Sequence, residues 1–125
     1  MTQTSTISSV HLRLSQELPV IAHSTTSRVI LNNDILRVIE FTFDAGELLT
    51  EHTSPKAVVV QLIEGEMNFN VNGQTHTFLP GDVIYLAPGE PHALTAVTAC
   101  RMSLVMVHTD KHCLEANNAD SDSTN

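Results

Sequence analysis

Apolar and polar residues alternate along most of this 125-residue chain, from about residue 28 to about residue 108. Successive side chains of a β-strand point to opposite faces, so a period of two predicts strands that each bury one face. Short clusters of glycine, asparagine and proline interrupt the alternation at regular intervals. Asn72-Gly73 is a strong hairpin signal, because a two-residue turn of this type needs positive φ at both positions. The pattern predicts short strands joined by tight turns, without a long helix.

The alternation also assigns the side chains that share a face, over roughly eight or nine strands. The apolar run from Val83 to Leu86 predicts a buried strand, and the segment from Val10 to Leu18 fits either an edge strand or a short helical turn. We therefore expect an all-β fold, an antiparallel jelly-roll barrel. The same-face sets are Ile35, Ile39, Phe41 and Phe43, then Val58, Val60 and Leu62, then Met67, Phe69 and Val71, and finally His92, Leu94 and Ala96.

The length and the apolar content, 42% of 125 residues, suit one domain with one core. We expect this single barrel domain to span residues 10–113. The Ser/Thr-rich residues 1–9 and the acidic tail at residues 114–125 have little apolar surface to bury, and we expect both to be disordered.

Charge and targeting signals narrow the classes of partner. Fourteen acidic residues against six basic ones give a net charge of −8, which would repel the phosphates of a nucleic acid. The apolar runs are too short to span a membrane, and the first residues lack the basic and apolar segments of a signal peptide. We therefore expect a cytoplasmic protein, whose Cys100 and Cys113 form no metal-binding or redox pair motif.

Two segments, residues 46–65 and 81–92, carry glycines and one histidine each at defined spacing. The first pairs Gly46 with His52, and the second pairs Gly81 with His92. This spacing resembles the two motifs of the cupin family, G-x5-H-x-H-x3,4-E-x6-G and G-x5-P-x-G-x2-H-x3-N. The resemblance covers about residues 28–108. It implies a cupin-like barrel in which four side chains meet in an interior pocket and usually bind a metal.

Only two of those four positions keep a residue that binds metals well. His52 and His92 are retained, whereas Ser54 replaces the second histidine of the first motif and Val58 replaces its glutamate. The resemblance implies that all four side chains face the same pocket. Valine has no ligand atom, and a serine hydroxyl is a poor ligand while it keeps its proton.

A divalent transition metal, such as Fe, Mn, Ni or Zn, normally takes at least three protein ligands. His52 and His92 would therefore need a recruited third ligand. His76 has suitable chemistry, although the resemblance puts an ordinary core residue there. Glu51 and Glu90 would reach the pocket only if the backbone departs from the family pattern.

Three classes of function remain open. The favoured one is a small-molecule-binding protein, metal-free or weakly metal-binding, whose apolar barrel pocket uses His52 and His92 as polar anchors. The second is an enzyme, either a metal-dependent dioxygenase or isomerase with a recruited ligand, or a metal-free acid–base catalyst built on two imidazoles. The third is a non-catalytic scaffold. The resemblance implies a homodimer in all three cases.

Overall fold

The computed structural model describes residues 4–109, which form nine β-strands and one single-turn helix. The all-β fold and its antiparallel strands are as the alternation predicts. The elements, in chain order, are α1 (Leu14–Glu17), β1 (Thr25–Asn32), β2 (Leu36–Phe43), β3 (Leu48–His52), β4 (Ala57–Glu64), β5 (Met67–Val71), β6 (Gln74–Phe78), β7 (Val83–Leu86), β8 (His92–Ala96) and β9 (Cys100–Val107).

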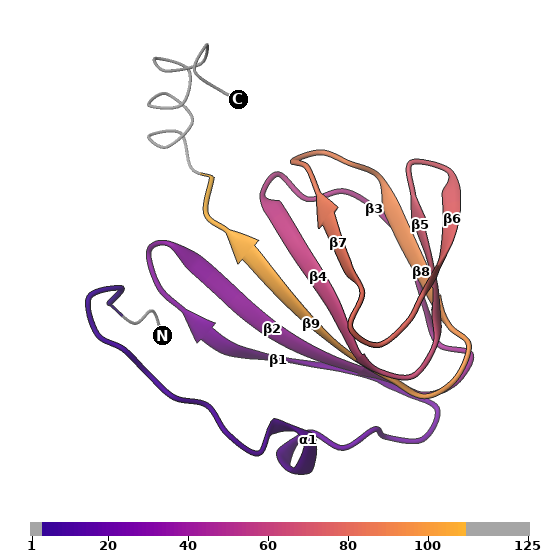
Figure 1. Cartoon of the computed structure of the whole chain (residues 1–125), viewed down its shortest axis with the longest axis horizontal. Helices are drawn as coiled ribbons and strands as arrows, with labels where there is room; N and C mark the ends of the chain where they lie inside the picture. The colour runs from indigo at the N-terminus through magenta and orange to yellow at the C-terminus, as the bar shows by residue number, and fades with distance from the viewer. Residues whose placement is uncertain (1–3, 110–125) are drawn as a thin grey trace.

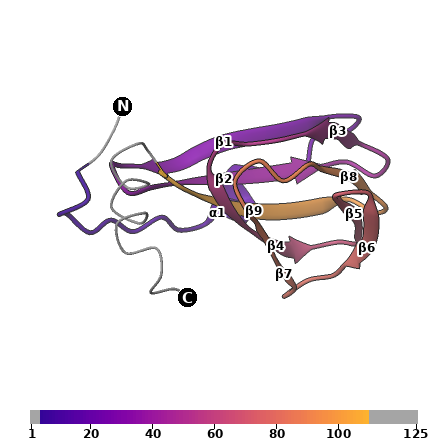
Figure 2. The ribbon, with the colours of Figure 1, turned by 90° about the horizontal axis from the view of Figure 1, so that it is seen from above.

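The strands form two antiparallel sheets. One has five strands in the order β1-β2-β9-β4-β7, and the other has four in the order β3-β8-β5-β6. Strands that are distant in sequence lie side by side, as β2 and β9 do, which is the arrangement of a jelly roll. Seen from above in Figure 2, β3, β8, β5 and β6 gather at one side, and β1, β2 and β9 extend beyond them.

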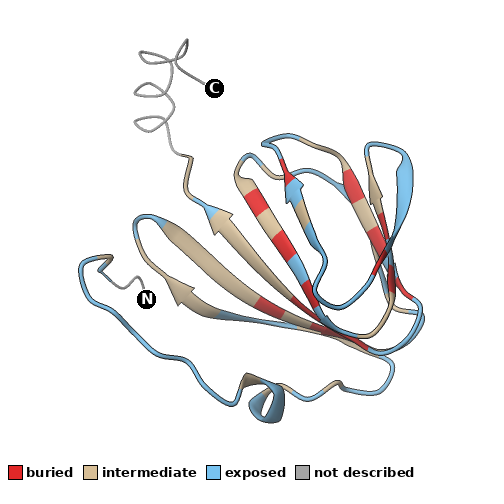
Figure 3. Ribbon diagram, in the orientation of Figure 1, coloured by how far each residue is buried: buried red, intermediate tan, exposed pale blue. Residues whose placement is uncertain are grey.

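One end of the barrel, here called the Gly65 end, is densely packed. The strands converge there in Figure 1, and Figure 3 shows buried segments where they meet. Gly65, in the turn between β4 and β5, has φ of +93°, and a Cβ built on it would lie 2.2 Å from the carbonyl oxygen of Ala99. Only glycine fits this position. The buried side chains of this end are Phe43, Leu62, Met67, Phe78, Ala96, Cys100 and Met102.

The opposite end, here called the histidine end, is defined by the strand register. Two loops lie there, β3–β4 and β7–β8, and they are joined by a hydrogen bond of 2.7 Å from the Gly89 amide to the Ser54 carbonyl. The side chains of this end are Arg37, Met106, Val58 and Leu86 in the five-stranded sheet, and His52, His92 and Val71 in the four-stranded sheet.

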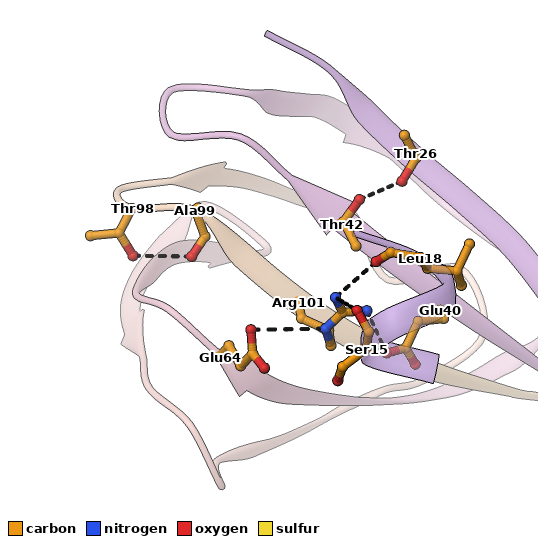
Figure 4. Close-up of polar contacts among 9 residues, drawn as sticks. All are labelled: Ser15, Leu18, Thr26, Glu40, Thr42, Glu64, Thr98, Ala99 and Arg101. Atoms are coloured by element: carbon orange, nitrogen blue, oxygen red, sulfur yellow. Dashed lines mark hydrogen bonds and ion pairs between the residues drawn. The ribbon is translucent and has the colours of Figure 1, made fainter. Parts of the chain in front are cut away.

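The N-terminal segment is attached to the outer face of the five-stranded sheet through one buried arginine. Arg101 on β9 donates hydrogen bonds to the carbonyls of Ser15 and Leu18, at 3.1 and 2.8 Å, and forms an ion pair of 3.4 Å with Glu40. The exposed carboxylate of Glu64 lies 3.9 Å from the same guanidinium (Figure 4). Because helices shorter than three turns are marginal by themselves, we attribute the persistence of α1 to these contacts.

Two local predictions are resolved by the structure. The segment Val10–Leu18 contains the helical turn α1 and no strand. The prediction of a buried strand at Val83–Leu86 is half right: Leu86 is buried, but Val83 and Tyr85 are 56% and 62% exposed. The reason is that β7 is an edge strand whose second face has no covering layer.

Several expectations on the rest of the chain stay predictions. Residues 4–9 contain no helix or strand, and the predicted disordered tail, residues 114–125, lies outside the described residues. No helix within residues 4–109 has the length and apolar character needed to span a bilayer.

Candidate functional site

His52 and His92 lie next to each other at the histidine end. His52 is the last residue of β3 and His92 the first of β8, and the two are register partners. Partners in an antiparallel pair present their side chains on the same face. The two imidazole rings consequently lie with their centroids 4.2 Å apart, at an angle of 60°.

The same backbone contact orients both imidazoles. Nδ1 of His52 lies 2.7 Å from the carbonyl oxygen of Thr50, and Nδ1 of His92 lies 2.9 Å from that of Glu90. A carbonyl oxygen only accepts, so Nδ1 carries the proton and donates it in each ring. In the neutral tautomer Nε2 then holds a free lone pair. Within residues 4–109, neither Nε2 has a hydrogen-bond partner, so both are available to a ligand.

Packing fixes one histidine more firmly than the other. His92 is 7% exposed, and its ring stacks on Phe69 of β5, with centroids 6.2 Å apart and an interplanar angle of 9°. His52 is exposed. The pair therefore has an inner member held by an aromatic ring and an outer member that reaches solvent.

Beside the histidines, the two sheets enclose a cavity of about 50 Å³. It is bounded by apolar side chains of both sheets, and the two imidazoles are its polar members. A site of this size holds only a few non-hydrogen atoms, since one water needs about 10–15 Å³ on the same kind of measure. The lining residues are Phe41, Val60, Leu86, Met102 and Leu104 of the five-stranded sheet, and Leu49, His52, Phe69, His92 and Leu94 of the four-stranded sheet.

The sequence comparison decides the family. The family model described as "Cupin domain" matches residues 39–108, more than half of the chain. The chain belongs to the cupin family. Both histidines of the site fall within the matched residues, and the jelly roll described above is the corresponding fold.

Solved structures agree with this assignment. A conserved protein of unknown function from Streptococcus pyogenes is 30% identical, with a TM-score of 0.73 over 86% of this chain and 95% of that one. A cupin superfamily protein from Desulfitobacterium hafniense is 18% identical, with a TM-score of 0.72 over 81% and 93% of the two chains. The polyketide cyclase RemF from Streptomyces resistomycificus is 24% identical, with a TM-score of 0.62 over 68% and 66%. The second and third of these structures are less than 25% identical to this chain, so their similarity shows the fold alone. No curated protein sequence matches this chain.

The cupin positions at 54 and 58 do not line the cavity. β3 ends at His52, so the strand alternation expected to carry Ser54 to the interior stops before it. Ser54 lies in the loop, where its hydroxyl accepts a hydrogen bond from the Lys56 amide at 3.2 Å. Val58 is 2% exposed and packs in the core, on the same inner face as Val60.

The candidates for a recruited metal ligand lie elsewhere. His76, on the edge strand β6, is exposed and lines a separate groove with Val71 and Ile84. Glu51 is exposed and lies with Asn68 in another surface depression. Glu90 contributes its backbone carbonyl, as the acceptor for His92.

The donor set described here does not fit a divalent metal. Many cupins bind one, but His52 and His92 supply two imidazoles where at least three protein ligands are the rule. Within residues 4–109, no group of three or more His, Cys, Asp or Glu side chains could hold a metal ion.

Other reactive groups do not join the site. Cys100 lies at the Gly65 end and is 1% exposed, and burial raises the pKa of its thiol, which keeps it protonated and unreactive. The motifs gave no reason to select Leu49 or Phe69 as site residues. The alternation did place Phe41, Phe69 and Leu94 on buried faces, but it could not show that these faces leave a cavity between them.

Proposed function

We propose that this cupin binds a small molecule without needing a resident divalent metal. The ligand places a short apolar group in the cavity and a polar group at Nε2 of His52 and His92. The observation that carries the proposal is the combination of two imidazoles, each oriented by a backbone carbonyl, with an apolar cavity beside them.

The imidazole orientation supports a binding role, because it is set before any ligand arrives. Both Nδ1 atoms are already hydrogen-bonded, so binding a hydroxyl or amide donor at Nε2 requires no rearrangement of the rings. His92 is also held by Phe69. Preorganised polar groups in an apolar pocket are the usual arrangement of a small-molecule site.

The cavity size restricts the ligand. About 50 Å³ accommodates a branched group of a few carbon atoms, and the rest of the molecule must lie towards His52, where the site reaches solvent. The expected ligand is therefore compact, with one apolar end and one polar end.

The test is a thermal-shift screen of compact neutral and charged molecules, because a ligand of the folded state raises the melting temperature. We expect active compounds to stabilise the wild type and His76→Ala equally and to lose their effect in His52→Ala/His92→Ala. His76→Ala is the matched control, since it removes an exposed imidazole outside the cavity. His52→Ala alone serves as a second variant, because His52 is exposed and its loss leaves the core packing intact.

Two results would contradict the proposal. Ligand stabilisation that survives in both His52 variants would place the binding site elsewhere. A metal content near one ion per chain by plasma mass spectrometry, lost in His52→Ala/His92→Ala, would favour the metal-dependent enzyme instead. The homodimer implied by the family stays a prediction, which sedimentation analysis of the purified chain checks.

A further inference from the structure

Arg37 lies on the inner face of the barrel, at the histidine end. On β2 it is two residues from Ile39 and four from Phe41, which lines the cavity, so the three side chains share a face. Its register partner on β9 is Met106, which packs against the core. Two independent relations, along the strand and across it, therefore point this side chain towards the interior.

The guanidinium of Arg37 lacks an anionic partner in the described chain. Its Nε is buried without a hydrogen-bond partner within residues 4–109, and no ion pair there includes Arg37. The Nε of Arg101, on the outer face, also lacks a hydrogen-bond partner among the described residues, but its terminal nitrogens have Glu40 and two carbonyls as partners, which Arg37 does not. A buried guanidinium N–H without an acceptor is costly. An anionic ligand would supply the missing acceptor.

Arg37 and Val58 belong to the same row across the sheet. Met106 pairs with Arg37 on one side and with Val58 on the other, which puts the two residues two strands, or roughly 10 Å, apart. Val58 stands where the family motif has its glutamate. This row has thus no acid at position 58 and a base at position 37. The charge of this row is opposite to that of the family motif and suits an anion.

A polar side chain beside Arg37 can also donate a hydrogen bond to an anion. Asn32 is the register partner of Arg37 on β1, and its Oδ1 lies 3.1 Å from Nε2 of His108. The amide group of Asn32 is therefore left to donate. Asp34, three residues before Arg37, is exposed and forms no ion pair with it within residues 4–109. A hydrogen bond with the Ser5 hydroxyl is the main cause that lowers the pKa of the Asp34 carboxyl.

We infer that the ligand of this site is a small carboxylate with a short, branched apolar tail. The carboxylate binds the guanidinium of Arg37, a hydroxyl of the same ligand donates to Nε2 of His52 or His92, and the apolar tail enters the cavity beside them. The inference rests on the proposed binding function and adds the charge of the ligand to it. Arg37 is then a specificity-determining residue that distinguishes an acid from a neutral molecule of the same shape.

The test compares 2-hydroxyisovalerate with 2-hydroxyisovaleramide, which share a tail and a hydroxyl donor and differ in charge. Binding is followed by ligand-observed NMR titration at millimolar concentration. We expect the wild type to bind the acid at least tenfold more tightly than the amide. Arg37→Met should remove this preference by weakening the acid alone. Arg28→Met is the matched control, because it removes the same charge from an exposed position on β1 and should leave the preference unchanged.

The outcomes separate this inference from the proposed function. Equal binding of acid and amide, lost in His52→Ala/His92→Ala, would overturn the role of Arg37 and retain the binding site. A preference that falls equally in Arg28→Met and Arg37→Met would reflect net charge and would also overturn it. If neither probe binds, the inference of a short-chain carboxylate ligand is overturned. The neutral compounds of the thermal-shift screen then test the proposed binding function separately.

Discussion

The two ends of the barrel satisfy opposite physical demands. At the Gly65 end, side chains such as Phe43 and Met67 are completely buried, and the turn glycine leaves no room for a Cβ against Ala99 and Cys100 at the start of β9. At the histidine end, Val58 and Leu86 are buried, but Arg37 and Met106 are only partly buried, His52 is exposed, and a cavity remains between the sheets. The same strands run through both ends, so the difference comes from the side chains and not from the fold.

This difference indicates how stability and function are divided. Close packing without voids stabilises the Gly65 end. The histidine end keeps an unfilled volume, which is unfavourable in the free protein and available to a ligand, and the partnerless Nε–H of Arg37 adds a further cost there. Substitutions at the first end should therefore reduce stability, and substitutions at the second should change binding more than stability.

The largest expected effect is that of Gly65→Ala. The new Cβ would lie 2.2 Å from the Ala99 carbonyl oxygen and 2.8 Å from Cys100 Sγ, at a φ of +93°. Strain and overpacking together should lower the free energy of unfolding by about 4 kcal/mol. Gly73→Ala is the matched control, because Gly73 has φ of +86° with nothing within 4 Å, and it should cost only about 1 kcal/mol. Urea denaturation measures both; equal losses would show that the Gly65 end is not tightly packed.

A smaller loss is expected for Arg101→Met on the outer face near the same end. It leaves the buried Glu40 carboxylate without its cation and two carbonyls of the N-terminal segment without a donor. Removing one member of a buried pair should cost about 3 kcal/mol at neutral pH. Glu40→Gln/Arg101→Met should recover part of this loss, because the remaining side chain is neutral. A double variant no more stable than Arg101→Met would contradict this account.

The loss in Arg101→Met should also depend on pH. Burial already raises the pKa of Glu40 above its ordinary value of 4.5, and Arg101 opposes that shift. Without Arg101 the pKa of Glu40 rises further, so the folded state binds a proton more readily than the unfolded state. Stability therefore falls as pH rises from 4.5 through the folded pKa, and is regained on acidification. Denaturation curves at several pH values would show a loss that shrinks towards the acid limit; a constant loss would exclude Glu40 as its cause.

The smallest expected change is a gain at the histidine end. Arg37→Met removes a buried N–H that lacks an acceptor and keeps an apolar stem of similar length. We expect the free energy of unfolding to rise by about 1 kcal/mol, a shift of a few degrees in melting temperature, while carboxylate binding is lost. Arg28→Met, at an exposed site, should change stability by less than half as much. A destabilised Arg37→Met protein would mean that the guanidinium has a structural role.

Much of the fold could be predicted because strand periodicity is local. Asn72-Gly73 predicted the β5–β6 hairpin, and the alternation of Met67, Phe69 and Val71 identified the inward face of β5. The exposure of Val83 and Tyr85 could not be predicted, because an apolar strand has the same sequence pattern at the edge of a sheet as in its centre. Only the strand order shows that β7 lies at an edge.

The sequence predicted the two histidines of the candidate site but not the residues around them. Motif spacing selected His52 and His92, and their register pairing brings the two rings together. The family resemblance implied that Ser54 faces the pocket, but β3 ends at His52 and Ser54 lies in the following loop. Arg37 lies outside both motifs. Its spacing from Ile39 and Phe41 places it on the apolar face of its strand, but only the structure shows that its Nε has no partner within residues 4–109.

The sequence by itself determined the strands, the turns, the family and the two histidines, because each depends on residues close together in the chain or on spacing within one motif. The tertiary structure decided which histidine is buried, where the cavity lies, and that Arg37 shares a row with Val58 across β9. These properties depend on contacts between strands distant in sequence. The register that creates those contacts is set when both sheets pack together, and no single segment encodes it.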